Sequence, residues 1–229
     1  MYKKIPLREK VKSQLISGSP TKDEDNDVLY FQHPDNFPFP MQHKDDVELE
    51  NRGIIIIDQY ICKETLAKAY KRLLAIHFDE TFTDEVQIIL NSPGGQCDAG
   101  WAFIDLMGFV KNPIKTIAMG EVCSMATHIF IAGDHRVVAP NTSAMIHQFS
   151  DYGEGNYGDL IAKQKGWKLE MEKDIAHLIR CSKYTSRSQV EKNLLKGNDN
   201  WLSPKEMKKH GLCEEIFKPA PRGSKSKKK

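Results

Sequence analysis

The stretch Glu85-Val-Gln-Ile-Ile-Leu-Asn-Ser-Pro-Gly-Gly95 decides the fold of this chain. Its first half, residues 85–90, is a short and mostly branched apolar run, which predicts a buried strand. Its second half is a turn made of small residues, proline and glycine. The next segment, residues 98–110, has apolar residues at helical steps: Phe103, Leu106, Met107 and Val110. The stretch therefore predicts a strand, a tight turn and a helix in succession.

The same alternation continues on both sides of this unit. Strands are predicted at residues 53–58, 114–119, 136–139 and 143–148, and helices at residues 63–77 and 125–132. A further short helix is predicted from a capping box with proline at its first position and glycine at its end: Ser203, Pro204, Glu206 and Gly211. Repeated strand–helix–strand units indicate a parallel sheet covered by helices, so the predicted fold class is α/β.

The longest helical pattern covers residues 159–181 and has an apolar stripe along most of its length. A helix of roughly 20 residues spans about 30 Å, which is long for a helix that packs only on its own domain. Two interpretations stay open. The segment is either a core helix or a helix that projects to contact another subunit.

Composition divides the chain into three regions. Residues 1–46 are polar and rich in turn residues and proline, which predicts an extended or flexible leader. Residues 47–218 hold the alternating pattern, and residues 219–229 form a basic tail. The last eight residues carry five positive charges, although the net charge of the whole chain is only +2. The body of the chain is therefore slightly acidic, which argues against nucleic-acid binding.

Composition also limits location and cofactors. No run approaches the roughly 20 apolar residues of a membrane span, and no apolar segment follows the basic N-terminus as in a secretory signal. The five cysteines lack CxxC or CxxH spacing, which favours free thiols in a reducing cytoplasm over a disulfide framework or a metal site. The chain has no GxxxxGK[ST] phosphate loop, so no ATP site of its own is expected.

A serine, a histidine and a carboxylate near predicted strand ends form a candidate catalytic set. Ser124 falls in a turn between a strand and a helix, where a hydroxyl is exposed beside helix N–H groups. A serine needs a base to become a nucleophile. His147 follows a different strand, and His128 lies one turn into the helix after Ser124, so both are candidates. The orienting carboxylate stays open among three residues: Asp134, Asp151 and Asp199.

Backbone N–H groups near the serine could stabilise an oxyanion. Gly94 and Gly95 tolerate unusual backbone angles and could direct an N–H group into the site. The N–H group of Met125 directly follows the candidate nucleophile. Two such donors are what the tetrahedral intermediate of acyl transfer requires.

Four short motifs occur in order along the chain: Ile89-Leu-Asn-Ser-Pro-Gly-Gly95, Gly120-Glu-Val-Cys-Ser-Met125, Met145-Ile-His-Gln148 and Asp199-Asn-Trp-Leu-Ser203. Together they resemble the Clp protease proteolytic-subunit family, over about residues 47–217. The resemblance implies a crotonase-like ββα spiral with a protruding helical handle at residues 159–181.

The resemblance also implies the activity and the roles of single residues. It implies a serine endopeptidase that forms an acyl-enzyme through a catalytic triad: Ser124, His147 and Asp199. It implies oxyanion donors at Gly95 and Met125. It further implies substrate-binding positions at Gly94, Gln148 and Phe149.

Partners follow from the same resemblance. Members of the family form homo-oligomers of two stacked heptameric rings that enclose the active sites. An ATP-dependent AAA+ unfoldase feeds unfolded polypeptides to them, so ATP would be used by the partner and not by this chain. Neither a nucleic acid nor a membrane is expected as a partner.

Other functions remain to be distinguished. A crotonase-fold enzyme acting on acyl-CoA thioesters would use the same oxyanion hole without a serine triad. An inactive ring scaffold would need none of the three catalytic side chains. A serine–lysine peptidase is a weaker variant, with Lys111 or Lys115 as the base.

Overall fold

The computed structural model describes residues 21–22, 29–32, 38–40, 48–49 and 51–219. Most of the predicted leader and nearly all of the basic tail lie outside these residues. Within the leader, three short strands pair antiparallel in chain order: β1 (Thr21–Lys22), β2 (Leu29–Gln32) and β3 (Pro38–Pro40). The composition of this region predicts an extended or flexible leader, and these short paired strands were not part of that prediction. The prolines are compatible with β3 because it is an edge strand, where a missing N–H group is tolerated.

The main sheet has the strand order β10–β7–β6–β5–β4, and all of these pairs are parallel. Its strands are β4 (Ile54–Ile57), β5 (Val86–Ser92), β6 (Ile114–Cys123), β7 (His135–Val138) and β10 (Glu215–Ile216). Two further strands extend it from the end of β6: β8 (Ser143–Ile146) and β9 (Asn200–Leu202). The parallel α/β sheet that the sequence predicts is therefore confirmed.

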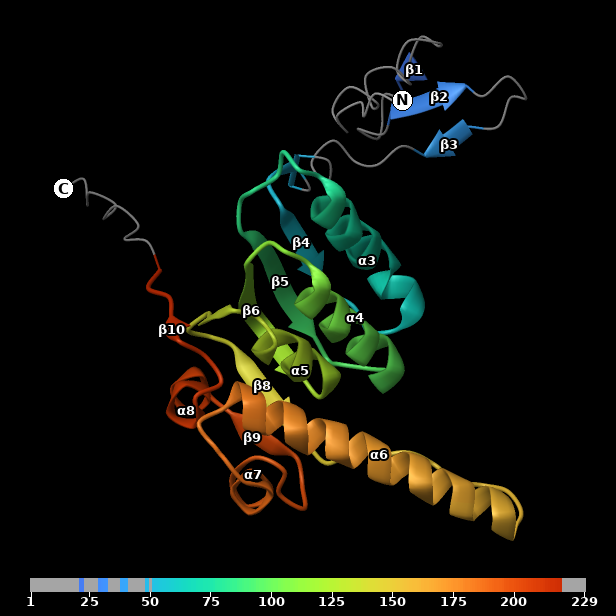
Figure 1. Ribbon diagram of the computed structural model, residues 1–229. Helices are drawn as coiled ribbons and strands as arrows, with labels where there is room; N and C mark the ends of the chain where they lie inside the picture. The colour runs from blue at the N-terminus through green and yellow to red at the C-terminus, as the bar shows by residue number, and fades with distance from the viewer. Residues whose placement is uncertain (1–20, 23–28, 33–37, 41–47, 50, 220–229) are drawn as a thin grey trace, which may run out of the picture.

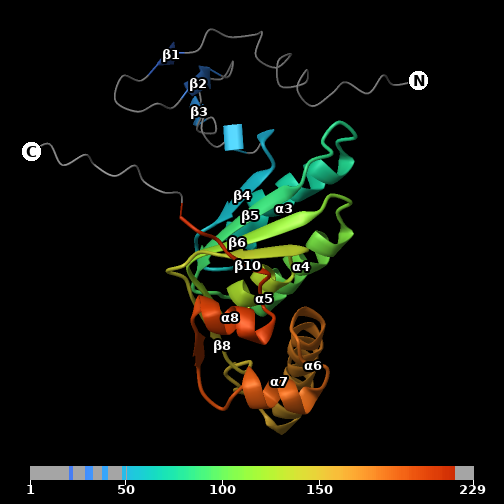
Figure 2. The same ribbon diagram turned by 90° about the vertical axis from the view of Figure 1, so that its left-hand side faces the viewer.

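Helices connect these strands and cover the sheet. They are α3 (Lys63–Phe78), α4 (Cys97–Phe109), α5 (Met125–Ile131), α6 (Tyr157–Cys181), α7 (Arg187–Asn193) and α8 (Pro204–His210). Helices α3, α4 and α5 lie together against one face of the sheet (Figure 1). Figure 2 shows α6, α7 and α8 gathered below the sheet, apart from α3. Among the described residues, no helix is both long enough and apolar enough to cross a membrane.

A bulge divides strand β6 into two parts with different neighbours. Residues 115–118 pair with β7, whereas residues 121–123 pair with β8. Gly120 lies between them with φ +66°, and a Cβ there would come within 2.5 Å of Asn91 Oδ1. The same Asn91 oxygen accepts a hydrogen bond from the N–H group of Glu121 (3.1 Å). The bulge therefore redirects the end of β6 toward β8.

Helix α6 projects from the body of the protein. Along this 25-residue helix, none of residues 157–173 is buried, whereas four residues of its last two turns are: Asp174, Ile175, His177 and Leu178. Figure 1 shows the free end reaching far beyond the sheet. The projection that one of the two interpretations predicts is therefore confirmed, whereas contact with another subunit stays a prediction.

Several predicted boundaries need correction. The strand predicted at 114–119 continues to Cys123, because the bulge lets it gain β8 as a second partner. The strand predicted at 143–148 ends at Ile146. Strand β9 was not predicted, because three residues carry too weak a pattern. The capping box at Ser203 and the left-handed Gly211 at the end of α8 are confirmed.

The two phenylalanines of α4 differ in burial, which predicts different effects of their substitution on stability. Phe103 is fully buried, whereas Phe109 is 59% exposed. We expect Phe103→Ala to lower the free energy of unfolding by about 3–5 kcal/mol, because it leaves a cavity. Phe109→Ala should change it by no more than about 0.5 kcal/mol. Urea unfolding followed by circular dichroism measures both, and equal shifts would contradict this description of the core.

Candidate active site

Ser124 occupies a sharp turn between β6 and α5. Its backbone has φ 52° and ψ −124°, and it is the single non-glycine residue with positive φ in the described part of the chain. The turn is held by a hydrogen bond from the N–H group of Ser124 to the carbonyl of Met145 (2.8 Å). Such a backbone conformation costs roughly 1–3 kcal/mol and is common at functional sites. It leaves the serine side chain half-exposed at the carboxyl end of β6.

His147 lies within hydrogen-bonding distance of this serine. Its Nε2 is 2.7 Å from Ser124 Oγ. The parallel pairing of Cys123 with Met145 creates this proximity, because Ser124 and His147 then leave adjacent strands close together. A neutral imidazole that accepts the serine proton at Nε2 carries its own proton at Nδ1. The pair can therefore act as nucleophile and general base.

Asp199 lies on the other side of the His147 ring. Strand β9 pairs antiparallel with β8 and sets Asn200 opposite Ile146, so the next residues of this register are His147 and Asp199. The His147 Nδ1 to Asp199 Oδ1 distance is 3.9 Å, which is within ion-pair range but too long for a hydrogen bond. The Asp199 side chain is 60% exposed. The structure therefore brings the three side chains together, but His147 and Asp199 are not joined by a hydrogen bond.

The other candidate carboxylates are engaged elsewhere. Asp134 Oδ2 accepts a hydrogen bond from the N–H group of Ile114, at the opposite end of β6. Asp151 accepts one from the indole of Trp167 on α6 (2.8 Å). That bond, together with the N–H group of Tyr152, lowers the pKa of Asp151. Neither carboxylate is positioned to orient His147.

The alternative bases are also placed away from the serine hydroxyl. His128 is buried, and its Nδ1 faces the backbone carbonyl of Ser124 (3.1 Å) instead of Oγ. Lys111 Nζ donates to the carbonyl of Asp79. Lys115 lies near the start of β6, paired with β7, far along the strand from Ser124.

The expected oxyanion donors flank the serine. In the described part of the chain, the N–H groups of Gly95 and Met125 donate to no protein acceptor. Gly94 comes so close that a Cβ there would lie 2.9 Å from the Ser124 Cβ and 2.4 Å from the Cys123 carbonyl. Only glycine permits this approach, because Gly94 also has φ +96°. The glycine turn is thereby held directly against the serine turn.

The three residues expected to bind substrate lie in different surroundings. The N–H group of Gly94 donates to Ser92 Oγ, and its carbonyl accepts from Ile61, so its backbone groups are already bonded. Gln148 Nε2 donates to the carbonyl of Leu195 (3.2 Å). Phe149 is half-buried and lines the pocket beside Ser124.

This pocket has a volume of about 70 Å³ and contains residues that the sequence analysis did not assign to the site. Cys97 and Asp174 line it together with His128. Asp174 is far from the motifs in sequence, and no local pattern in the long helix distinguishes it from the other charged residues there. Burial, followed by the negative charges of Asp174 and Glu170, raises the pKa of Cys97 to about 11, so its thiol stays protonated at neutral pH.

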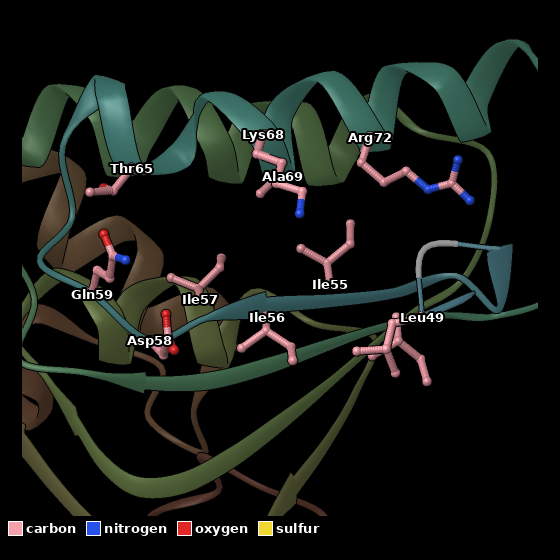
Figure 3. Close-up of a pocket in the computed structure, with 11 residues that line it drawn as sticks. Leu49, Ile55, Ile56, Ile57, Asp58, Gln59, Thr65, Lys68, Ala69 and Arg72 are labelled. Carbon is pink, nitrogen blue, oxygen red and sulfur yellow. The ribbon is translucent and has the colours of Figure 1, made fainter. Parts of the chain in front are cut away.

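A larger hollow lies elsewhere, between the edge strand β4 and helix α3. Its volume is about 340 Å³. Figure 3 shows Ile55 and Ile57 pointing from the strand toward Ala69 and Lys68 on the helix. The residues that line it include no serine, histidine or cysteine. Hydrolytic chemistry is therefore supported only at the smaller pocket beside Ser124.

Known proteins match the region that holds this site. The family model described as Clp protease matches residues 42–220. The ATP-dependent Clp protease proteolytic subunit of Deinococcus radiodurans is 34% identical over 135 residues, which cover 58% of this chain and 65% of that subunit. Subunit 2 of Treponema denticola is 34% identical, with 74% of this chain and 84% of that subunit covered. Subunit 3 of Streptomyces avermitilis is 31% identical, with 73% and 75% covered. The chain belongs to the Clp protease family of serine peptidases.

Proposed function

We propose that this protein is an endopeptidase that cleaves unfolded polypeptides through an acyl-enzyme on Ser124. The observation that carries the proposal is the 2.7 Å contact between His147 Nε2 and Ser124 Oγ at the ends of two adjacent strands. A hydroxyl beside an imidazole nitrogen and two open N–H donors is the arrangement that acyl transfer requires. Family membership supports the same reaction class.

In the first half of the reaction, Ser124 Oγ attacks the scissile carbonyl while His147 Nε2 takes the hydroxyl proton. The carbonyl oxygen becomes an oxyanion that receives hydrogen bonds from the N–H groups of Gly95 and Met125. His147 then gives its proton to the leaving amine, and the carbon–nitrogen bond breaks. The Asp199 carboxylate attracts the Nδ1–H side of the ring and stabilises the imidazolium that forms transiently.

The second half of the reaction removes the acyl group. A water molecule attacks the ester carbonyl while His147 Nε2 takes one of its protons. The same two backbone donors stabilise the second oxyanion. His147 returns the proton to Ser124 Oγ, and the carboxylic acid product leaves. The reaction needs only water and the residues of the chain, so no cofactor enters the proposal.

We further propose that the protein works as two stacked heptameric rings joined through helix α6. The free part of this helix carries exposed apolar residues: Tyr157, Leu160, Ile161 and Leu169. Exposed apolar side chains on one projecting element favour burial against another subunit. Burial there would enclose the serine sites in a chamber.

An enclosed chamber admits only extended chains, so an AAA+ unfoldase that hydrolyses ATP is the proposed partner. The relatives' names, which call them subunits of ATP-dependent proteases, support this partner. The five cysteines, all in the described region, are free thiols, which favours the cytoplasm as the proposed location.

The two competing functions have less support from the geometry. An acyl-CoA enzyme would use the oxyanion donors but has no need of the His147–Ser124 contact. An inactive scaffold needs neither. No observation specifically favours either one.

Chemical labelling tests the proposed nucleophile. We expect a fluorophosphonate probe to modify Ser124, because His147 raises the reactivity of its hydroxyl, and mass spectrometry identifies the modified residue. Ser124→Ala should abolish labelling because it removes the hydroxyl, and His147→Ala should abolish it because a neutral hydroxyl without its base reacts slowly. Ser143→Ala, on exposed strand residue Ser143, is the matched control and should label normally. Assembled protein that resists the probe would overturn the proposed function.

Two conservative substitutions test which carboxylate orients the base. We expect Asp199→Asn to lower kcat for peptide hydrolysis on the order of 10²–10⁴-fold, because the imidazolium loses its countercharge. Asp151→Asn should leave kcat within about twofold, because Asp151 binds Trp167 instead. A reversed pattern would show that the loop after β8 rearranges to supply the carboxylate.

A charged substitution on helix α6 tests the proposed contact between the two rings. Ile161 is 50% exposed, and Ile161→Glu should bury a charge at the proposed ring–ring contact. We expect native mass spectrometry to show half the mass of the wild-type particle. Gly166→Glu is the matched control, because Gly166 lies in open space on a different side of the same helix. Equal masses for both variants and the wild type would rule out α6 as the contact.

A further inference from the structure

The pocket beside Ser124 is lined by both apolar side chains and a carboxylate. Among the residues that line it are Met125 and Phe149, which are apolar, and Asp174, which carries a carboxylate. The residue Asp174 is only 8% exposed. It belongs to the buried end of α6 and lines the pocket together with Gly95 of the glycine turn. The pocket beside Ser124 therefore combines two large apolar side chains with a carboxylate.

The Asp174 carboxylate lacks a hydrogen bond within the described part of the chain. Its nearest polar neighbour is His128, whose Nε2 lies 3.0 Å from Asp174 Oδ1. This contact is short but not aligned as a hydrogen bond, because the same nitrogen counts among the buried polar atoms without one. The His128 ring is fixed from its other side, where Nδ1 faces the Ser124 carbonyl. The contact with His128 uses Oδ1 and lies within ion-pair range, so Oδ2 is the Asp174 oxygen that is left to accept a hydrogen bond from a donor outside the chain.

Several acidic side chains lie around Cys97 at this end of the pocket. Besides burial, the negative charges of Asp174, Glu170 and Asp98 raise the pKa of Cys97, and the positive charge of Lys173 lowers it. His177 stacks on His128, with ring centroids 5.6 Å apart. Burial, followed by the proximity of His128, lowers the pKa of His177 to about 3, so this second ring adds no positive charge at neutral pH.

We propose that this pocket selects a lysine or arginine side chain at the residue whose carbonyl Ser124 attacks. The inference rests on the proposed peptidase function and specifies its substrates. The aliphatic stem of a basic side chain would lie against Met125 and Phe149, and its charged end would donate to Asp174.

The dimensions of the pocket suit such a side chain. One imidazole ring, that of His128, separates the Ser124 carbonyl from the Asp174 carboxylate. The volume of about 70 Å³ is several times the roughly 10–15 Å³ that one water molecule needs, so the outer part of a side chain can replace water there. Acidic side chains would face the carboxylate and be rejected.

A panel of peptides that differ only at the cleaved position tests the inference on the wild-type protein. We expect kcat/KM for lysine and arginine peptides to exceed that for leucine and methionine peptides at least tenfold, and the glutamate peptide to be the poorest. Faster cleavage after leucine, methionine or glutamate would overturn the inference, whatever the variants do.

Substitutions then assign the selectivity to one carboxylate. Asp174→Asn should reduce the lysine-to-leucine ratio of kcat/KM at least tenfold, mainly through lysine. Glu172→Gln is the matched control, because Glu172 lies on the same helix but is exposed and paired with Arg187. It should leave the ratio unchanged. A ratio that Asp174→Asn does not alter would also overturn the assignment.

The outcome separates this inference from the proposed function. If Ser124 takes up the fluorophosphonate and peptides are cleaved with an apolar preference, only the inference fails. If no peptide is cleaved and Ser124 is not labelled, the peptidase function itself fails.

Discussion

The strained turn at Ser124 is the constraint on which the site depends. A serine with positive φ is held between two fixed elements, the carbonyl of Met145 and the glycine turn at Gly94. The glycine turn does not tolerate a larger residue, since a Cβ at Gly94 would lie 2.9 Å from the Ser124 Cβ. Strain of this size persists only where the surrounding structure determines the backbone more than once. The two elements provide that determination from opposite sides of the turn.

Strand register brings the candidate catalytic side chains together. The bulge at Gly120 gives the end of β6 a new neighbour, and β8 then brings His147 beside Ser124. Strand β9 pairs with β8 in turn, and its register places Asp199 opposite His147. Each of the three residues lies just outside a paired strand. The positions of the three side chains therefore follow from backbone hydrogen bonds and need few contacts between the side chains themselves. The 3.9 Å distance between His147 Nδ1 and Asp199 Oδ1, which is too long for a hydrogen bond, is consistent with this.

The sequence predicted the parts of this arrangement that depend on local patterns. Alternating apolar segments indicated the parallel sheet, and the capping signals at Ser203 and Gly211 marked α8 correctly. Residue types alone left the base and the carboxylate open, because the distance between His147, His128 and Ser124 is decided by strand pairing. Strand β9 and the bulge could not be predicted, since three residues and one glycine carry no periodic signal. Asp174 was missed for a related reason, because the helical stripe gives its face but not the pocket that the face meets.

Helix α6 contributes both to the pocket beside Ser124 and to the exposed apolar surface that projects from the protein. Its buried end supplies Asp174 and His177, which pack beside the carbonyl of the serine turn through His128. Its exposed half carries apolar side chains that lack cover within the described chain. A rigid helix transmits a rotation along its whole length, so subunits that pack against the free end would also set the position of Asp174 at the pocket wall. In the proposed assembly, subunit contact and substrate selection would therefore depend on the same helix, because a displacement at one end of α6 would move the other end through the helix backbone.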